Sequence, residues 1–230
     1  MVLGIYGAGG LGREVYELAL DVNAVKKQWD AFVFIDDAET LSGTEIYDVP
    51  VMPFASFQEK YGADAAEIAI AVGEPAIRTI LRNKVKQGGY ALAILVHPST
   101  RLSRWAVLEE GAIITYGCNI SCGTHVKTNA YLQPSCGLGH DTIVGEDSVV
   151  SACARIAGGV TVGERVYIGM SALLKEGITV GNDVIIGMAS VVHKPIDDSL
   201  IVMGNPARIK YYVCECSEKM NFVDNKFNNK

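Results

Sequence analysis

The sequence predicts two successive folds in one chain: a small α/β domain over residues 1–97 and a parallel β-helix over residues 98–210. Two patterns carry this prediction. Strands and helices alternate in the first part, which is typical of a parallel α/β sheet. An aliphatic residue recurs at every sixth position in the second part, which is typical of a β-helix. The remaining residues, 211–230, are expected to form a tail that is disordered over residues 225–230.

Composition favours a protein with a sizeable core and argues against several functions. The chain has 230 residues, of which 49% are hydrophobic, and its formal net charge is −6. This charge argues against a nucleic-acid-binding surface, and the apolar runs are far shorter than the roughly 18 residues of a membrane-spanning helix. The first residues lack the basic region of a secretion signal. We therefore expect a cytoplasmic protein that binds neither nucleic acid nor a membrane.

The cysteines and histidines do not suggest a metal site. The six cysteines lie at positions 118, 122, 136, 153, 214 and 216, without the two pairs at ligand spacing that a zinc site needs. The four histidines form no group of three in the sequence. We therefore expect reduced thiols and no bound metal.

The first 97 residues contain alternating strand and helix patterns. Short apolar runs predict strands over residues 2–6, 31–35, 68–72 and 91–96. An apolar stripe predicts a helix over residues 12–27. A second helix is expected to begin at Pro75 and to end before Gly88 and Gly89. Such a domain is about half of a full dinucleotide-binding fold.

A glycine-rich loop joins the first expected strand to the first helix. Residues 7–12, Gly-Ala-Gly-Gly-Leu-Gly, fit the G-x-G-x-x-G pattern that lets a phosphate approach backbone N–H groups at a helix N-terminus. Asp36 and Asp37 follow the second strand, where an acid that binds a ribose lies in such folds. The loop alone would suggest a nicotinamide dinucleotide, but so short a domain suits a single nucleotide better. A purely structural glycine turn remains the alternative.

The six-residue period in the second part has no break. It is followed by sixteen aliphatic residues: Leu102, Leu108, Ile114, Ile120, Val126, Leu132, Leu138, Val144, Val150, Ile156, Val162, Ile168, Leu174, Val180, Ile186 and Val192. The residue two positions earlier is often small, as at Ala112, Cys118, Ala130, Cys136, Ser148 and Ala154. Three hexapeptides make one triangular coil, so residues 18 apart are expected to stack about 4.8 Å from each other.

The residues two positions after these aliphatic residues fall into three columns. A polar column, expected to face water, contains Thr128, Glu146, Glu164 and Asn182. An apolar column, expected to meet a partner subunit or a flexible apolar ligand, contains Pro134, Ala152, Met170 and Met188. The third column contains Cys122, His140, Gly158, Glu176 and Lys194. It stacks a possible base on a glycine whose N–H could stabilise an oxyanion, with Asp141 placed to orient the imidazole. A surface histidine beside an acid is the alternative interpretation.

These motifs together resemble the sugar O- and N-acetyltransferases of surface-polysaccharide and glycan synthesis. That family includes sialic acid O-acetyltransferases, UDP-4-amino-sugar N-acetyltransferases and GDP-perosamine N-acetyltransferases. The resemblance covers residues 2–210 and rests on IYGAGGLGREV at 5–15, FIDD at 34–37, AVGEPAIR at 71–78, LVHPS at 95–99, GHDTIVGED at 139–147 and GNPARI at 204–209. It implies a left-handed β-helix in a homotrimer, with acetyl-CoA between adjacent β-helices and a sugar nucleotide on the N-terminal domain of one subunit.

The resemblance also implies roles for individual residues. His140 corresponds to the catalytic base, Asp141 to its acidic partner, and the N–H of Gly158 to the oxyanion donor. Met170 and Met188 fall where the family's backbone follows the pantetheine arm, and Arg208 could meet a CoA phosphate. The nucleotide-binding positions are those of Gly9, Gly10, Asp36 and Gly73, with Asp37 beside them.

Three positions depart from the family pattern. Leu11 stands where many relatives have histidine in the glycine loop, and Gln133 stands where some N-acetyltransferases place an asparagine near the sugar amine. Val149 replaces a second histidine of some members. Leu11 and Gln133 remain candidate substrate-binding residues, and the departures concern the identity of the sugar rather than the reaction.

The sequence therefore predicts an enzyme that moves acetyl from acetyl-CoA to the amino group of a nucleotide-linked amino sugar, with a histidine general base. Transfer to a sugar hydroxyl, as on sialic acid, is the alternative within the same chemistry. A nicotinamide oxidoreductase and a non-catalytic scaffold are the alternatives from other classes. The residues leave open the sugar, its nucleobase, the acetylated position and the role of the tail.

Overall fold

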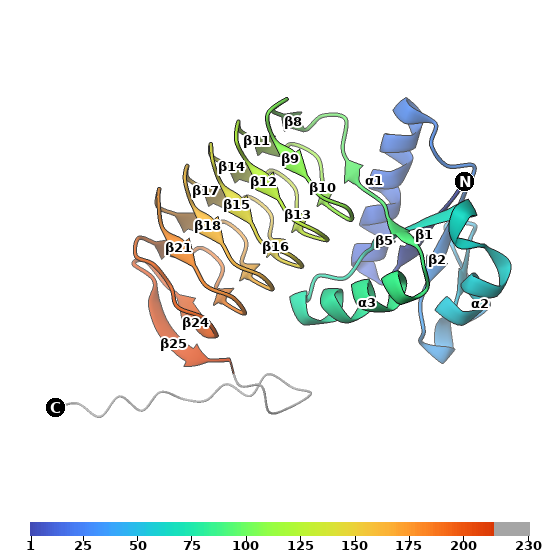
Figure 1. The fold of residues 1–230 in the computed structure, drawn as a ribbon. Helices are drawn as coiled ribbons and strands as arrows, with labels where there is room; N and C mark the ends of the chain where they lie inside the picture. The colour runs from blue at the N-terminus through green and yellow to red at the C-terminus, as the bar shows by residue number, and fades with distance from the viewer. Residues whose placement is uncertain (214–230) are drawn as a thin grey trace.

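A computed structural model of the protein describes residues 1–213 and shows two folds joined in one chain (Figure 1). An α/β domain forms the N-terminal part, and a β-helix of stacked coils lies beside it. The expected disorder of residues 225–230 falls outside the described residues. No helix in the described part is long and apolar enough to cross a membrane.

The N-terminal domain is a six-stranded sheet with helices on both faces. Its helices are α1 (Gly10–Lys26), α2 (Phe54–Lys60) and α3 (Pro75–Gln87), and it has 3₁₀ turns at Glu39–Leu41 and Ala63–Ala65. Its strands are β1 (Val2–Tyr6), β2 (Ala31–Ile35), β3 (Glu45–Ile46), β4 (Val49–Met52), β5 (Ala66–Ile70) and β6 (Ala91–Leu92), in the order β3-β4-β2-β1-β5-β6. All pairs are parallel except β3–β4. The buried residues of α1 pack on one face of this sheet, and those of α2 and α3 pack on the other.

Some expected elements of this domain have different bounds or different strand partners in the structure. The helix expected over 12–27 begins at Gly10, and the strand expected over 68–72 is β5 at Ala66–Ile70. The run 91–96 is not one strand, because β6 pairs with β5 whereas β7 (Leu95–Val96) pairs with β10 of the β-helix. The chain changes sheets here, and a continuous apolar run gives no sign of such a change of partner.

The β-helix consists mainly of two-residue strands that pair in parallel with the strands 18 residues away. These strands are β7 (Leu95–Val96), β8 (Arg101–Leu102), β9 (Val107–Leu108), β10 (Ile113–Ile114), β11 (Asn119–Ile120), β12 (His125–Val126), β13 (Tyr131–Leu132), β14 (Gly137–Leu138), β15 (Ile143–Val144), β16 (Val149–Val150), β17 (Arg155–Ile156), β18 (Thr161–Val162), β19 (Tyr167–Ile168), β20 (Leu173–Leu174), β21 (Thr179–Val180), β22 (Ile185–Ile186) and β23 (Val191–Val192). Together with the two strands of a terminal hairpin, they form three sheets of eight, six and five strands. The antiparallel hairpin β24 (Leu200–Met203) and β25 (Arg208–Tyr212) completes the largest sheet.

The expected six-residue ladder is confirmed as the core of this prism. Its members from Ile114 to Val192 are at most 3% exposed, and the small residues two positions earlier are buried with them. Leu102 and Leu108 lie in the first coil and are more exposed. Burial of one aliphatic side chain per strand therefore holds the coils together.

The polar column does not simply face water as expected. Thr128, Glu146, Glu164 and Asn182 are all half-buried. Glu146 lies 3.5 Å from Arg82 of α3, and the side chain of Asn182 accepts the N–H of Glu164 at 2.9 Å. The column borders the N-terminal domain and bonds to its own coils, so part of its polar surface is used internally.

A fully buried arginine joins the two folds. The guanidinium of Arg78, on α3, donates to the carbonyls of Ile70 and Val72 at 2.8 and 2.9 Å. It also donates to the carbonyl of Asn129, in a β-helix turn, from Nε at 2.9 Å, and to the Asn129 side chain at 2.7 Å. Burial lowers the pKa of Arg78 to about 10, opposed by the charge of Asp147.

A buried carboxylate extends this contact. Asp147 is 1% exposed, accepts hydrogen bonds from Arg82 and Thr79 of α3, and accepts the amide of Asn129 at 2.7 Å. Asn129 and Asp147 are one coil apart, and both have positive φ, which Asn and Asp tolerate better than most residues. The domain is thus fixed against the turns of two successive coils.

Replacing Arg78 by Met is expected to lower the free energy of unfolding by about 3–5 kcal/mol, because four acceptor groups, three of them buried, lose their donor. Urea titration followed by circular dichroism measures this loss. Arg13→Met is the matched control, since Arg13 is exposed and makes no side-chain hydrogen bond within residues 1–213. Its effect should stay within about 0.5 kcal/mol. Equal effects of the two substitutions would contradict the role of Arg78 as the joint between the domains.

Candidate functional site

His140 and Asp141 form a hydrogen-bonded pair on the surface of the β-helix. They lie in the turn after β14, and Nδ1 of His140 is 2.8 Å from Oδ2 of Asp141. The two side chains are 66% and 71% exposed, so solvent and substrates can reach them. The bond to Asp141 holds one ring nitrogen and leaves Nε2 available to a ligand.

Stacking places this pair between two glycines. A methyl group added to Gly158, one coil after His140, would lie 2.5 Å from Nε2 of the imidazole. One added to Gly123, one coil before Asp141, would collide with Oδ1 of that carboxylate. A side chain at either place would therefore require the imidazole or the carboxylate to move, and the imidazole lies directly over bare backbone.

The N–H of Gly158 is available as a donor beside this imidazole. The next residue bonds between coils, as Gly159 donates to the carbonyl of His140 at 2.8 Å. At some corresponding positions on the other edges a side chain accepts the N–H, as Gln133 does for Ala152 at 3.2 Å. Within residues 1–213 no such side chain accepts the N–H of Gly158. The site can therefore offer a base and a hydrogen-bond donor to one ligand.

A groove of about 810 Å³ lies between α1 and one edge of the prism. We call this edge the groove edge; its turns follow strands of the eight-stranded sheet and carry Tyr116, Pro134, Ala152, Met170 and Met188. The groove brings together five of the predicted site residues, namely Gly10, Leu11, Gly73, Gln133 and Met170. Residues distant in sequence and from both folds thus meet there.

Asp36 and Asp37 do not line this groove and have partners of their own. Asp36 accepts the N–H groups of Ala8 and Ala38, each at 3.0 Å, and so supports the glycine loop. Asp37 accepts from Tyr6, from Lys84 and from the N–H of Phe54. Burial raises the pKa of Asp37, but the hydrogen bonds from Lys84 and Tyr6 outweigh it, so the pKa is lowered. A ribose hydroxyl could therefore bind only to the carboxylate lone pairs of Asp36 and Asp37 that these hydrogen bonds leave free.

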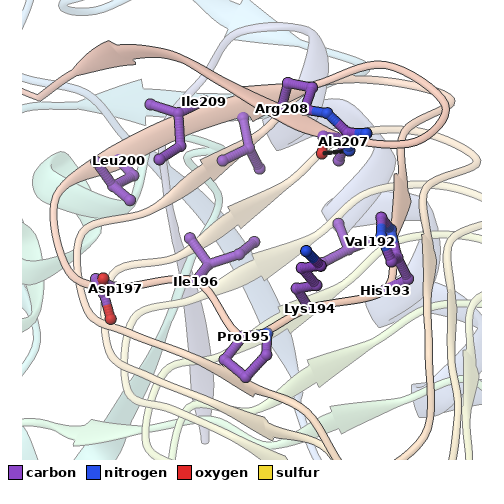
Figure 2. A pocket seen from close by; sticks show the side chains of 11 residues that line it. Val192, His193, Lys194, Pro195, Ile196, Asp197, Leu200, Ala207, Arg208 and Ile209 are labelled. Carbon is purple, nitrogen blue, oxygen red and sulfur yellow. Dashed lines mark hydrogen bonds between the residues drawn. The ribbon is translucent and has the colours of Figure 1, made fainter.

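Gly9, Met188 and Arg208 also lie outside the groove. Gly9 precedes α1 and has open space where a side chain would project. Met188 is 74% exposed, one coil beyond Met170, which is 53% exposed. Arg208 lines a separate pocket of about 490 Å³ at the C-terminal end of the prism. Figure 2 shows His193, Lys194 and Arg208 on one side of that pocket, away from Asp197.

The His140 pair and the groove lie on different edges of the prism. His140 belongs to the edge whose turns follow the strands of the six-stranded sheet of the β-helix. We call it the histidine edge; it also carries Arg104, Cys122 and Gly158. A face of the six-stranded sheet separates the two edges. One chain therefore contains both halves of the predicted site but does not bring them together.

Three acidic residues of the groove were missed by reasoning from the sequence. Glu14, Glu17 and Asp21 line it from α1. Their spacing of three and four residues places them on one helix face, a signal that the sequence does contain. Within residues 1–213 no group of three His, Cys, Asp or Glu side chains is arranged to hold a metal ion.

Comparison with known proteins identifies similar chains. Residues 2–85 match the family described as the PglD N-terminal domain. A dTDP-3-amino-3,6-dideoxy-alpha-D-galactopyranose 3-N-acetyltransferase from Aneurinibacillus thermoaerophilus is 53% identical over 36 residues, which cover 16% of this chain and 19% of that protein. A GDP-perosamine N-acetyltransferase from Escherichia coli is 27% identical over 165 residues, 69% of this chain and 71% of that protein. The chain thus spans under a fifth of the first relative and most of the second.

Two solved structures extend the similarity over both folds. The acetyltransferase domain of PglB from Neisseria gonorrhoeae, in complex with acetyl coenzyme A, has a TM-score of 0.84 and 26% identity, covering 90% of this chain and 98% of that chain. A variant of GDP-perosamine N-acetyltransferase from Caulobacter crescentus, with a histidine changed to alanine, is in complex with CoA and GDP-perosamine. It has a TM-score of 0.84 and 26% identity, covering 91% and 97% of the two chains. The expected resemblance to sugar acetyltransferases, and the fold of an α/β domain followed by a left-handed β-helix, are confirmed.

Gly158→Ala is expected to displace the imidazole of His140 without unfolding the protein, because the three atoms nearest to the added methyl group all belong to this ring. A crystal structure of the variant, or the nuclear magnetic resonance shift of the His140 ring, measures this displacement. Gly62→Ala is the control, because its added methyl group would meet open space. An unmoved His140 ring in Gly158→Ala would contradict the stacking.

Proposed function

We propose that this protein transfers acetyl from acetyl-CoA to the amino group of a nucleotide-linked amino sugar. The observation that carries this proposal is the imidazole of His140, held by Asp141 over the free N–H of Gly158. A base beside an oxyanion donor is the arrangement that acyl transfer needs. The relatives named as nucleotide-sugar N-acetyltransferases support an amine as the acceptor.

In the proposed reaction His140 takes a proton from the sugar amine as the C–N bond forms. The amine nitrogen attacks the thioester carbonyl, and the carbonyl oxygen gains negative charge near the N–H of Gly158. The C–S bond then breaks, and the CoA sulfur leaves with the proton that the imidazole returns. Asp141 orients the ring and stabilises its protonated form.

Acetyl-CoA is the proposed donor, and it would follow the groove edge. Met170 and Met188 present exposed, flexible apolar side chains one coil apart, which suits a pantetheine arm. The pocket at the C-terminal end adds Lys194 and Arg208, whose charges suit the phosphates of CoA. The similar PglB domain in complex with acetyl coenzyme A supports this choice of donor.

The nucleotide sugar is proposed to bind in the groove beside α1. Backbone N–H groups at the start of α1 and the residues Gly10, Leu11 and Gly73 lie at its N-terminal-domain side. Gln133 lies at its β-helix side, within reach of a sugar. Asp36 and Asp37 would contribute to the nucleotide through the acceptor positions left free by their own partners.

A homotrimer would complete the site. The histidine edge of one chain and the groove edge of a second can meet when copies associate head to tail, and such contacts close into a ring of three. The exposed Met170 and Met188 would then be covered by a neighbour, which stabilises association. A cytoplasmic location is proposed for the same protein, because acetyl-CoA and nucleotide sugars are available there.

His140→Ala is expected to lower kcat by about 10²–10⁴-fold, the usual contribution of a positioned general base. The fold and the affinity for acetyl-CoA should persist, because the side chain is exposed. Release of the CoA thiol across UDP-, dTDP- and GDP-amino sugars, with free and CMP-linked sialic acid as hydroxyl acceptors, measures this effect.

Two further variants control the measurement. Asp141→Asn should lower kcat less than His140→Ala, since the base remains. His125→Ala should leave kcat near the wild-type value, since His125 pairs with Glu109 outside the predicted site. Near-wild-type turnover of His140→Ala on the true substrate would refute the assignment of the base.

Gly9→Val is expected to weaken the binding of the sugar nucleotide about tenfold or more while the affinity for acetyl-CoA stays unchanged. The free protein has room for the new side chain, so the added bulk acts on a phosphate that approaches the loop. Isothermal titration calorimetry measures both affinities, with Gly62→Val as the control at another open position. Tight binding of NADH, with no binding of any sugar nucleotide, would favour the oxidoreductase alternative instead.

A further inference from the structure

Two unpaired arginines and an exposed tryptophan form a patch in the first coil of the β-helix. Arg101, Arg104 and Trp105 line a cavity of about 420 Å³, and no carboxylate lines it. Trp105 is 72% exposed. Within residues 1–213 neither guanidinium has a hydrogen bond or an ion pair, a state that they share with Arg13 of α1. The other arginines, Arg78, Arg82, Arg155, Arg165 and Arg208, all donate from their side chains. We call these three residues the basic patch.

The acidic face of α1 is the complement of this patch. Glu14, Glu17 and Asp21 are exposed along the groove, and we call them the acidic stripe. In the described residues no lysine or arginine pairs with them, and their nearest partner is Nε2 of His97, 3.1 Å from Asp21. Three carboxylates in a groove proposed to hold a diphosphate would repel it unless a cation offsets them.

The patch and the stripe lie at the same level along the prism. Arg104 is on the histidine edge, two coils before His140. Asp21 contacts His97, which follows β7 in the first coil and donates its N–H to Ile114 one coil further on. In a ring whose axis is parallel to the prism, residues that meet across an interface share a level. The patch of one chain therefore faces the Asp21 end of the stripe in the next.

The His140 pair is also level with the groove. His140 lies, along the coil path, between Pro134 and Ala152, and both of these residues line the groove. A contact that fixes the first coil against the C-terminal half of α1 would set His140 of one subunit opposite the groove of its neighbour. Arginine and tryptophan are also the residue types most enriched among residues that dominate binding at interfaces.

We infer that, in the trimer proposed above, the basic patch of each subunit docks on the acidic stripe of the next subunit and aligns His140 with that subunit's groove. The contact rests on the proposed trimer. It makes the trimer a head-to-tail ring, because each subunit presents its basic patch to one neighbour and its acidic stripe to the other. It also brings two guanidiniums to a groove that is otherwise lined by three carboxylates, which makes the groove more favourable for a diphosphate.

The test reverses the charges of the two surfaces, singly and together, in the full chain. Light scattering at micromolar concentration measures the molar mass of each variant. Arg101→Glu with Arg104→Glu is expected to raise the dissociation constant of the trimer about 100-fold or more, because like charges then face each other. Glu17→Arg with Asp21→Arg should do the same. The four substitutions together should restore the trimer, since opposite charges face each other again. Raising the salt concentration should weaken the wild-type trimer.

Lys26→Glu is the matched control for charge. Lys26 is exposed in the last turn of α1 and lines neither surface, so the trimer should survive this substitution. Trp105→Ala should weaken the trimer without any change of charge. A second measurement is the affinity of each variant for a UDP-, dTDP- or GDP-linked sugar.

Several outcomes would overturn the inference. A wild-type chain that stays monomeric would do so, as would a trimer that survives Arg101→Glu with Arg104→Glu. If those two substitutions weaken sugar-nucleotide binding in an intact trimer, the patch binds phosphate rather than a second chain. In another outcome, the variants dissociate and recover as expected while the wild-type trimer releases no thiol with any nucleotide sugar. That result would refute the proposed function but would still support the docking contact.

Discussion

The buried guanidinium of Arg78 is the interaction on which the rest of the architecture depends. It joins the carbonyls at the end of β5 to a turn of the β-helix, and Arg82 and Asp147 extend the same contact. The segment after β5 contains Gly73, so this joint fixes Gly73 beside Gln133 and forms the groove between the two folds. Neither domain alone would have that groove. A buried cation surrounded by carbonyls also tolerates little displacement, because each lost hydrogen bond leaves a buried polar group unpaired.

The six-residue period determines the chemistry of the surface as well as the packing of the core. Because residues one coil apart are superimposed, the imidazole of His140 can lie over the backbone of Gly158, and Asp141 can lie beside Gly123. The same repeat leaves one N–H per turn outside the bonds between coils, and a side chain such as Gln133 accepts it in some turns. A repetitive scaffold therefore produces a specific site wherever the side chains of neighbouring coils differ.

Much of the fold could be predicted from the sequence, because one aliphatic position per six residues has a single structural explanation. The ladder, the small residues beside it and the stacking of His140 on Gly158 followed from that period. The short strands β3 and β4 could not be predicted, since hairpin pairing of such short segments depends on contacts with the rest of the sheet. The change of sheet between β6 and β7 is likewise a tertiary event. The separation of the groove from the histidine edge required knowing which face of the prism the N-terminal domain covers, and the roles of the individual site residues remain predictions.

The two glycines that enclose the His140 pair also govern how such a chain can change in length during evolution. The pair keeps its geometry only while Gly123, His140, Asp141 and Gly158 remain on the same edge of the prism in successive coils. Insertion of one whole coil beyond Gly177 would lengthen the prism by about 4.8 Å and leave the pair undisturbed. Insertion of a few residues between Gly123 and Gly158 would rotate one member to another edge and separate it from the others. Insertions that keep the pair intact are therefore expected to be whole coils placed outside residues 123–158.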